Sequence, residues 1–265
     1  MKYCYTTFLF FIGVVTNKKT LELLFFLIVF IGQIQITNAQ NSDKRIFVYD
    51  WFDQITGVES SELHYGEVYV EKHRMKSAKT KFFISPEFKE GAVYFNNQAY
   101  YNLKLKYDVF GDDLILQVKN QLGGAPLLLR KSKIDSFEFE GVRFKNIPKW
   151  FTGDENTSGF YEIYRTTPHF SVFKKHRKRL LKNLGTTSAY HEFEDLAPTF
   201  ALEYGGELFY ITKIKDIESI FPQYKDGLKS AFGKSLRGSK LIDDASIDVL
   251  VNFLEEQLSR TSHDE

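Results

Sequence analysis

The stretch Tyr101-Asn102-Leu103-Lys104-Leu105-Lys106-Tyr107 decides the fold class of this chain. Large apolar side chains occupy every second position, and polar side chains fill the positions between them. A strand points successive side chains to opposite faces, so this pattern predicts a β-strand with one buried and one solvated face. Residues 92–95 form another apolar run just before it. The pair Asn96-Asn97 between the two runs predicts a tight hairpin turn, because asparagine tolerates positive φ.

Similar short apolar segments, separated by turn residues, continue up to Ile211. Further strands are predicted over residues 114–118, 127–130, 137–140, 142–144, 160–165, 170–173, 199–204 and 207–211. The turns between them are short and no helical period intervenes, so successive strands should pair antiparallel as a meander. Aromatic residues make up 16% of the chain, which suits such a sheet because rings pack well across neighbouring strands.

After Ile211 the apolar residues recur every three or four positions, which predicts amphipathic helices. The stripes consist of Ile214, Ile217, Ile220, Phe221, Tyr224, Leu228, Phe232, Ile247, Leu250, Val251, Leu254 and Leu258. We expect an α+β protein: a mainly antiparallel meander over residues 40–211, built as a sandwich or a half-barrel-like sheet, with a helical lobe over residues 212–260 packed on it. Residues 261–265 should be a disordered tail.

Residues 1–39 have the layout of a signal peptide. Lys18 and Lys19 precede the apolar run 21–36, and Thr37-Asn38-Ala39 supplies small residues at a cleavage site before Gln40. We therefore expect an exported protein, found in the periplasm, in the outer envelope or outside the cell. The alternative is an inner-membrane anchor at 21–36, although a spanning helix needs about 20 apolar residues. The earlier apolar run 8–15 suggests the hypothesis that translation starts downstream of Met1.

Charge and cysteine content exclude several classes. Lys and Arg number 35 against 34 Asp and Glu, so nothing calls for nucleic acid as a partner. The single cysteine, Cys4, excludes a disulfide framework and any multi-cysteine metal site. One basic run is a candidate contact patch for a polyanion such as an anionic lipid surface, and the alternative is the solvated end of a strand. It contains Lys174, Lys175, Arg177, Lys178 and Arg179.

No motif marks an enzyme. His191-Glu192-Phe193-Glu194-Asp195 begins like a zinc-protease helix but carries aspartate where the second histidine belongs. No Gly-x-Ser-x-Gly turn and no phosphate-binding glycine loop is present. We therefore assign no catalytic residue, no cofactor and no metal ligand. The grouped acids are Asp108, Asp112, Asp113, Asp154 and Glu155.

Two functions remain after this elimination. The first is a non-enzymatic envelope or periplasmic protein that binds a protein, a glycan or a lipid surface. The alternative is a secreted hydrolase of polysaccharides that uses the grouped loop acids, since glycoside hydrolysis needs two carboxylates facing each other across a cleft. Acidic turns more commonly serve only the turn itself.

Two parts of the chain resemble uncharacterised exported proteins of Bacteroidota. One is residues 91–108 together with Asp112-Asp113-Leu114, in which a hairpin leads into an acidic turn and a strand. The other comprises Leu208-Phe209-Tyr210, Lys213, Ile220-Phe221 and Tyr224-Lys225. The resemblance extends loosely over residues 90–265 and implies export and a lysine-rich helical hairpin after the last strand. It implies no catalytic residue, and the chain departs from it at Val251-Asn252-Phe253-Leu254, where a tyrosine-rich ending is expected.

Overall fold

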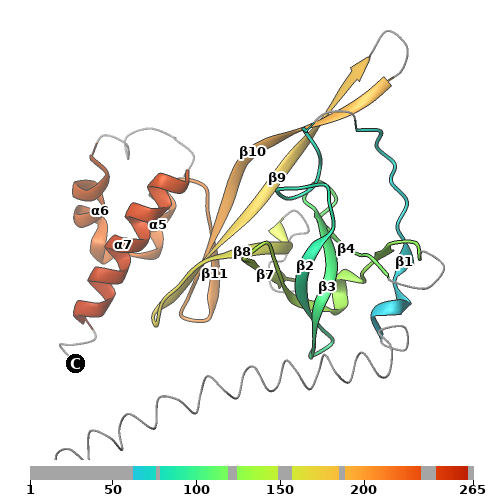
Figure 1. Ribbon diagram of the computed structural model, residues 1–265. Helices are drawn as coiled ribbons and strands as arrows, with labels where there is room; N and C mark the ends of the chain where they lie inside the picture. The colour runs from blue at the N-terminus through green and yellow to red at the C-terminus, as the bar shows by residue number, and fades with distance from the viewer. Residues whose placement is uncertain are drawn as a thin grey trace, which may run out of the picture. The chain divides into compact units, whose positions relative to one another are not determined.

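The computed structural model (Figure 1) describes residues 62–75, 78–118, 124–148, 157–184, 189–233 and 243–261. All of them belong to one compact unit, Thr56–Glu265. The predicted signal segment and its alternative as an anchor lie outside the described residues, as do the acids Asp154 and Glu155.

The dominant element is one sheet of eleven strands, in the order β1-β5-β4-β3-β2-β6-β7-β8-β9-β10-β11. Every neighbouring pair runs antiparallel, which confirms the predicted α+β class with a meander sheet. The strands are β1 (Glu67–Val68), β2 (Lys89–Phe95), β3 (Gln98–Asp108), β4 (Asp113–Leu116), β5 (Leu127–Leu128), β6 (Ile134–Phe139), β7 (Val142–Ile147), β8 (Gly159–Thr166), β9 (Phe170–Leu184), β10 (Ala189–Tyr204) and β11 (Glu207–Ile211).

Two connections join strands that are not neighbours in the sheet, one from β1 to β2 and a shorter one from β5 to β6. The short segment 129–133 joins β5 to β6, although β4, β3 and β2 lie between these two strands in the sheet. This segment contains the 3-10 helix η3 (Lys131–Lys133), which rises only about 2 Å per residue. Crossing four strand spacings of a flat sheet takes about 19 Å. The sheet therefore curls, so that β6 comes within reach of β5.

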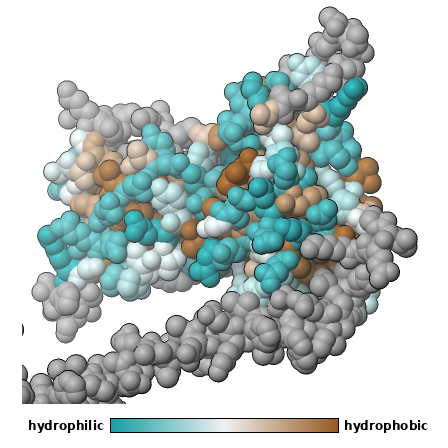
Figure 2. All heavy atoms as spheres, in the orientation of Figure 1, coloured by the Kyte–Doolittle hydropathy of each residue, from teal (hydrophilic) through white to brown (hydrophobic). Residues whose placement is uncertain are grey.

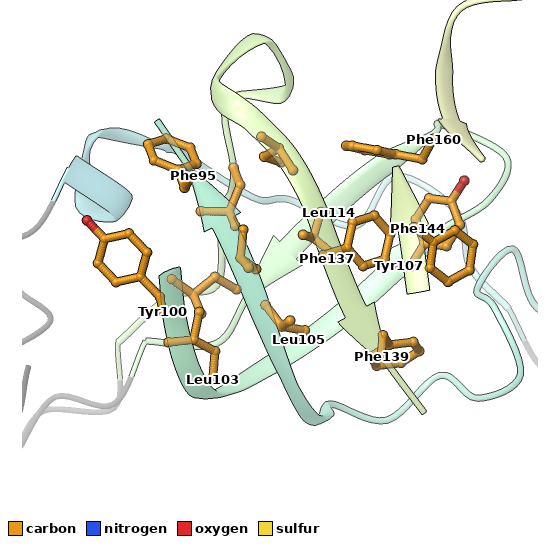
Figure 3. Close-up of a cluster of buried hydrophobic side chains, with 14 of the residues drawn as sticks. Phe95, Tyr100, Leu103, Leu105, Tyr107, Leu114, Phe137, Phe139, Phe144 and Phe160 are labelled. Atoms are coloured by element: carbon orange, nitrogen blue, oxygen red, sulfur yellow. The ribbon is translucent and has the colours of Figure 1, made fainter. Parts of the chain in front are cut away.

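The curled strands enclose the first core (Figure 3). Tyr107, on β3, is fully buried, and its ring lies 5.4 Å from that of Phe137 and 5.2 Å from that of Phe144. The Phe137 and Phe144 rings are themselves stacked at 4.7 Å. The other main members are Leu63, Phe83, Val93, Phe95, Tyr100, Leu103, Leu105, Leu114, Leu116, Ile134, Phe139 and Phe160. Aromatic side chains thus supply much of the apolar area buried here.

The predicted alternation of buried and solvated side chains over residues 101–107 is confirmed except at Tyr101. Leu103, Leu105 and Tyr107 are buried as predicted, but Tyr100 is buried in place of Tyr101. Asn102 has a φ of 54°, and the pairing of β2 with β3 shifts register between Gly91 and Val93. An extra residue in one strand moves the following side chains to the other face, and this bulge explains the difference.

The C-terminal helices pack on one face of β9, β10 and β11. Their bounds are α5 (Ile214–Ile220), η5 (Pro222–Tyr224), α6 (Lys225–Phe232) and α7 (Asp244–Thr261). Phe170, Val172, Phe200, Leu202 and Ile211 of the sheet form a second core with the helices. From the helices come Ile217, Phe221, Leu228, Ile247, Leu250, Val251, Leu254 and Leu258. The periodic apolar stripes of the sequence thus lie against the sheet.

The opposite face of the same strands carries a smaller cluster. Phe173 of β9 and Ala201 of β10 are buried there together with Ile147 of β7 and Tyr161 of β8. Val172 faces the helices while its neighbour Phe173 belongs to this second face, as expected for successive residues of a strand. Among the elements that the structure describes, no α-helix contributes a side chain to this cluster.

The β9–β10 hairpin is longer than the sequence predicted. Pairing of β9 with β8 involves residues 171–174, and pairing of β10 with β11 involves residues 200–204. Beyond these residues the two strands pair with each other as far as Leu184 and Ala189, as Figure 1 shows. The sequence indicated strands only over 170–173 and 199–204, because charged residues interrupt the apolar pattern of the distal half.

Candidate functional site

The basic run lies within β9, where successive residues alternate between the two faces. Four of its five cations contact a carboxylate, in the pairs Lys174–Asp244 (2.8 Å), Lys175–Asp112 (3.6 Å), Lys178–Asp195 (3.0 Å) and Arg179–Glu194 (2.5 Å). The fifth, Arg177, lines a hollow of about 260 Å³ together with Pro198 and Thr212. The carboxylates offset much of the positive charge that the sequence places in this run.

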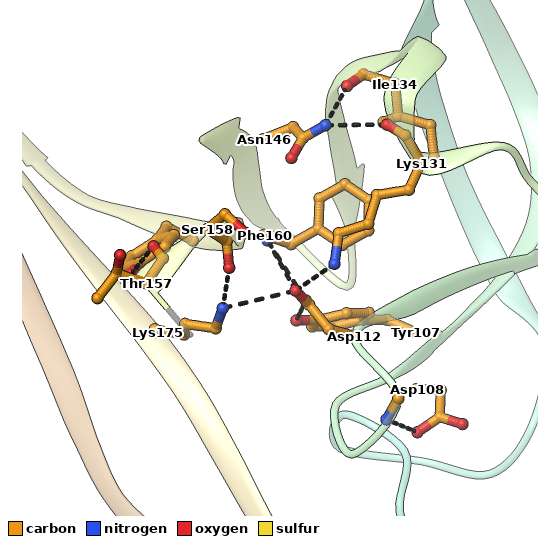
Figure 4. Close-up of polar contacts among 12 residues, drawn as sticks. Tyr107, Asp108, Asp112, Lys131, Ile134, Asn146, Thr157, Ser158, Phe160 and Lys175 are labelled. Atoms are coloured by element: carbon orange, nitrogen blue, oxygen red, sulfur yellow. Dashed lines mark hydrogen bonds and ion pairs between the residues drawn. The ribbon is translucent and has the colours of Figure 1, made fainter. Parts of the chain in front are cut away.

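The carboxylate of Asp112 binds groups from several parts of the sheet (Figure 4). Tyr107 donates its hydroxyl to Oδ1 at 2.8 Å, and Lys131 Nζ lies 2.5 Å from Oδ2. The backbone N–H of Phe160 donates to both oxygens at 3.3 Å, and Lys175 Nζ approaches from β9. Burial and the charge of Asp112 raise the pKa of the Tyr107 phenol well above its usual value. Asp112 therefore ties the β3–β4 turn to β8, β9 and η3.

The other two acids of this turn have different environments. Asp108 forms a buried ion pair with Lys81 at 2.7 Å and accepts the N–H of Gly111 at 2.9 Å. Burial, together with the nearby charges of Asp108 and Asp112, raises the pKa of Asp113 to about 6 against the pull of Lys131. Asp108 and Asp112 thus have partners inside the fold. None of the three acids lines the hollow beside Arg177, nor the hollows beside Lys145 and beside Tyr65.

Two histidines meet beside the N-terminal end of β10. The rings of His73 and His191 are 5.1 Å apart in an edge-to-face arrangement, and each has a buried Nδ1 without a hydrogen-bond partner. The nearest acid is Glu71, whose Oε1 lies 3.6 Å from Nδ1 of His73. Within the described ranges, no group of three or more His, Cys, Asp or Glu side chains could hold a metal ion.

Another hollow lies on the sheet face that bears the cluster around Phe173. We call it the β7 hollow, and its volume is about 420 Å³. Its polar lining residues are Ser132, Asp135, Lys145, Asn146 and Glu203. Its apolar lining residues are Ile134, Ile147, Pro148, Phe173 and Leu208. Concave sites of about 300–1,000 Å³ with apolar walls and a few polar groups are typical of small-ligand sites.

Contacts within the fold position the polar groups of the β7 hollow. Lys145 Nζ lies 3.4 Å from Oε2 of Glu203 and 5.1 Å from the ring centroid of Phe173. Asp135 accepts the backbone N–H of Asn97 at 3.1 Å. Asn146 donates to the carbonyl oxygens of Lys131 and Ile134, both at 2.9 Å (Figure 4), which fixes the orientation of its side-chain amide.

Sequence reasoning missed the β7 hollow. Its lining comes from η3, β6, β7, β9, β10 and β11, so no short motif contains it. Apart from Ser132 of η3, each polar member is one polar position in a strand. The sequence shows that these positions are polar, but only the sheet order places them around one hollow.

A third hollow of about 360 Å³ is lined by Glu62, Tyr65, Phe95, Arg130 and Lys133. On the face drawn in Figure 2, hydrophobic residues are interspersed among hydrophilic ones.

Comparisons of the chain with models of protein families, with curated proteins and with solved structures found no match.

Proposed function

We propose that this chain is an exported, non-enzymatic protein of the cell envelope or periplasm that binds its partner at the β7 hollow. The observation that carries the proposal is the contrast between two groups of polar residues. Asp108 and Asp112 are engaged inside the fold and line none of the described hollows, whereas Lys145, Asp135 and Glu203, each held by a contact within the fold, line an open hollow. Export rests on the sequence of residues 21–39.

The described carboxyl group with a raised pKa lies outside the β7 hollow. A general acid works best when its pKa is raised toward the working pH. Among the described carboxyl groups that show a clear shift, only Asp113 has a raised pKa, and Asp113 does not line the hollow. Asp135 and Glu203 each have a partner within the fold. Binding without bond cleavage suits this arrangement better.

Contact with a lipid surface receives less support than binding of a glycan or a protein. Four cations of the basic run have carboxylate partners, and electrostatic attraction to anionic lipid depends on unneutralised Lys and Arg. Among the described helices, none is long and apolar enough to cross a bilayer.

The full chain, expressed with its N-terminal segment in a bacterial host, tests the proposal. Fractionation should recover it outside the cytoplasm, and N-terminal sequencing should begin at Gln40. The recovered protein should bind soluble polysaccharides in affinity electrophoresis without releasing reducing ends. A cytoplasmic protein that retains Lys18, or one that releases sugar from any of these polymers, would contradict the proposal.

One observation favours the hydrolase as a second candidate. Burial raises the pKa of Asp113 to about 6, in a turn that also holds Asp108 and Asp112, and a carboxyl group with a raised pKa suits the general acid of glycoside hydrolysis. If the protein is a hydrolase of this kind, Asp113→Asn should abolish release of reducing ends, and Glu207→Gln at the exposed first residue of β11 should not.

A further inference from the structure

We infer that the β7 hollow is a binding site for an uncharged saccharide unit. This inference rests on the proposed function and adds a ligand class to it. It follows from the combination of donors, acceptors and apolar surface that lines one hollow of about 420 Å³.

The polar lining supplies both kinds of hydrogen-bonding group. Lys145 carries only donors, Asp135 and Glu203 carry only acceptors, and Ser132 carries both. A hydroxyl group is itself a donor and an acceptor, so a ligand with several hydroxyls can bind every one of these side chains. A simple amine would find partners in the two carboxylates but none in Lys145.

The net charge of the lining argues against an anionic ligand. Two carboxylates and one ammonium group line the hollow, and the ammonium of Lys145 already lies 3.4 Å from Glu203. An anionic ligand would therefore meet a net negative lining. A neutral ligand avoids both the repulsion by the carboxylates and the cost of desolvating a charge of its own.

The apolar lining suits the carbon-bound faces of a sugar ring. Leu208 and Pro148 are half-buried at the hollow, and Phe173 and Ile147 are buried in the cluster behind it. A pyranose has hydroxyls around its edge and C–H groups on its two faces. It can therefore place a face against Leu208 and Pro148 while its edge meets Asp135 and Glu203.

The test is a titration of the full-length exported protein with named trisaccharides. The uncharged probes are maltotriose, cellotriose, xylotriose, mannotriose and triacetylchitotriose. Trigalacturonate is the anionic probe and chitotriose the cationic one. Calorimetry should detect binding of at least one uncharged probe, and no binding of trigalacturonate.

Two variants test whether the saccharide binds in the β7 hollow. Ser132 is an exposed lining residue, so Ser132→Trp should fill the hollow and weaken binding more than tenfold. Glu203→Gln removes a charged acceptor and should weaken binding about tenfold. The matched controls Ser230→Trp on α6 and Glu218→Gln on α5 lie away from the hollow and should bind as the wild type does. Thermal melting of all four variants verifies that each is folded.

The possible results distinguish an error in the location or ligand class of the site from an error in the proposed function. Sugar binding that Ser132→Trp leaves intact would overturn the placement of the site at the β7 hollow, and would leave standing only that the protein is exported and binds without cleaving its ligand. Binding of chitotriose or trigalacturonate in place of every uncharged probe would overturn the ligand class, and binding of no probe by the folded protein would overturn it too. Release of reducing ends from a bound probe would overturn the proposed function itself.

Discussion

Lys81 and Asp108 form an ion pair of 2.7 Å in which the two side chains are only 5% and 6% exposed. Lys81 comes from the segment before β2, and Asp108 is the last residue of β3. Burial by itself lowers the pKa of Lys81, but its contacts with Asp108 and Tyr69 outweigh burial and raise the pKa above its usual value. Glu71 also approaches the Lys81 ammonium, at 3.1 Å. The pair thus fixes an otherwise irregular segment to the sheet.

Removing one partner of this buried pair should be costly. Lys81→Met leaves the charge of Asp108 uncompensated, and we expect a loss of about 3–5 kcal/mol in the free energy of unfolding. The control is Lys104→Met, which breaks the more exposed pair with Glu90 and should cost less than about 1 kcal/mol. Urea unfolding measures both. Equal effects would mean that burial does not set the strength of the Lys81–Asp108 pair.

Stability should depend on pH through Asp113. Its pKa is raised to about 6, above the unfolded value near 4, so the folded state binds this proton more tightly. The resulting stabilisation is present below about pH 4 and is lost as the pH rises through 6. Asp113→Asn should therefore stabilise the protein at pH 8 by roughly 1 kcal/mol, allowing for partial exposure, and should change little at pH 4.

Thermal melts of Asp113→Asn across this pH range check the prediction, with the exposed Glu207→Gln as the control. A destabilised Asp113→Asn at pH 8 would contradict it, because that result would mean that the charged carboxylate contributes favourably to folding.

Gly159 is required by its closeness to Asp112. It has a φ of 114°, and a Cβ there would overlap the carboxylate of Asp112. Gly159→Ala should therefore displace that carboxylate from Phe160 N and Lys131 and cost about 3 kcal/mol or more. The control is Gly141→Ala, at a φ of 75° with open space around it, which should cost about 1 kcal/mol. Denaturant titrations measure the free energy of unfolding that each variant loses. Similar losses would show that the positive φ alone, and not the contact with Asp112, makes glycine necessary at position 159.

The ion pairs of β9 predict weak attraction to membranes. The wild type should not sediment with vesicles that contain anionic phosphatidylserine at physiological salt, because carboxylates offset the charge of its cations. Replacing Arg177, Lys178 and Arg179 with Ser should leave both sedimentation and cell fractionation unchanged. Wild-type binding that this triple variant loses would instead assign the basic run to a lipid surface.

Local features of the sequence predicted much of the fold. The turn at Asn96 and Asn97 has φ values of 51° and 64°, as the residue types require. The turn at Gly205 and Gly206 has φ values of 59° and 81° and joins β10 to β11. These features could be predicted because a turn or an alternating strand depends on residues within a few positions of each other.

The candidate site could not be predicted in the same way. The sequence showed Asp112 only as one acid of a turn, and its partners Lys131 and Lys175 are 19 and 63 positions away along the chain. Asp135 and Glu203 gave no signal at all, because each is one polar position in an alternating strand.

The sequence by itself determined that this chain forms antiparallel strands followed by helices, since the spacing of apolar residues selects the local conformation and the short turns select the direction of pairing. Only the tertiary structure decided that β6 lies beside β2, that Asp112 becomes a partly buried partner of two lysines, and that polar residues of several strands line the β7 hollow. The physical reason is that the curl of the sheet brings together side chains that are far apart in the sequence, and no local pattern encodes which of them will meet.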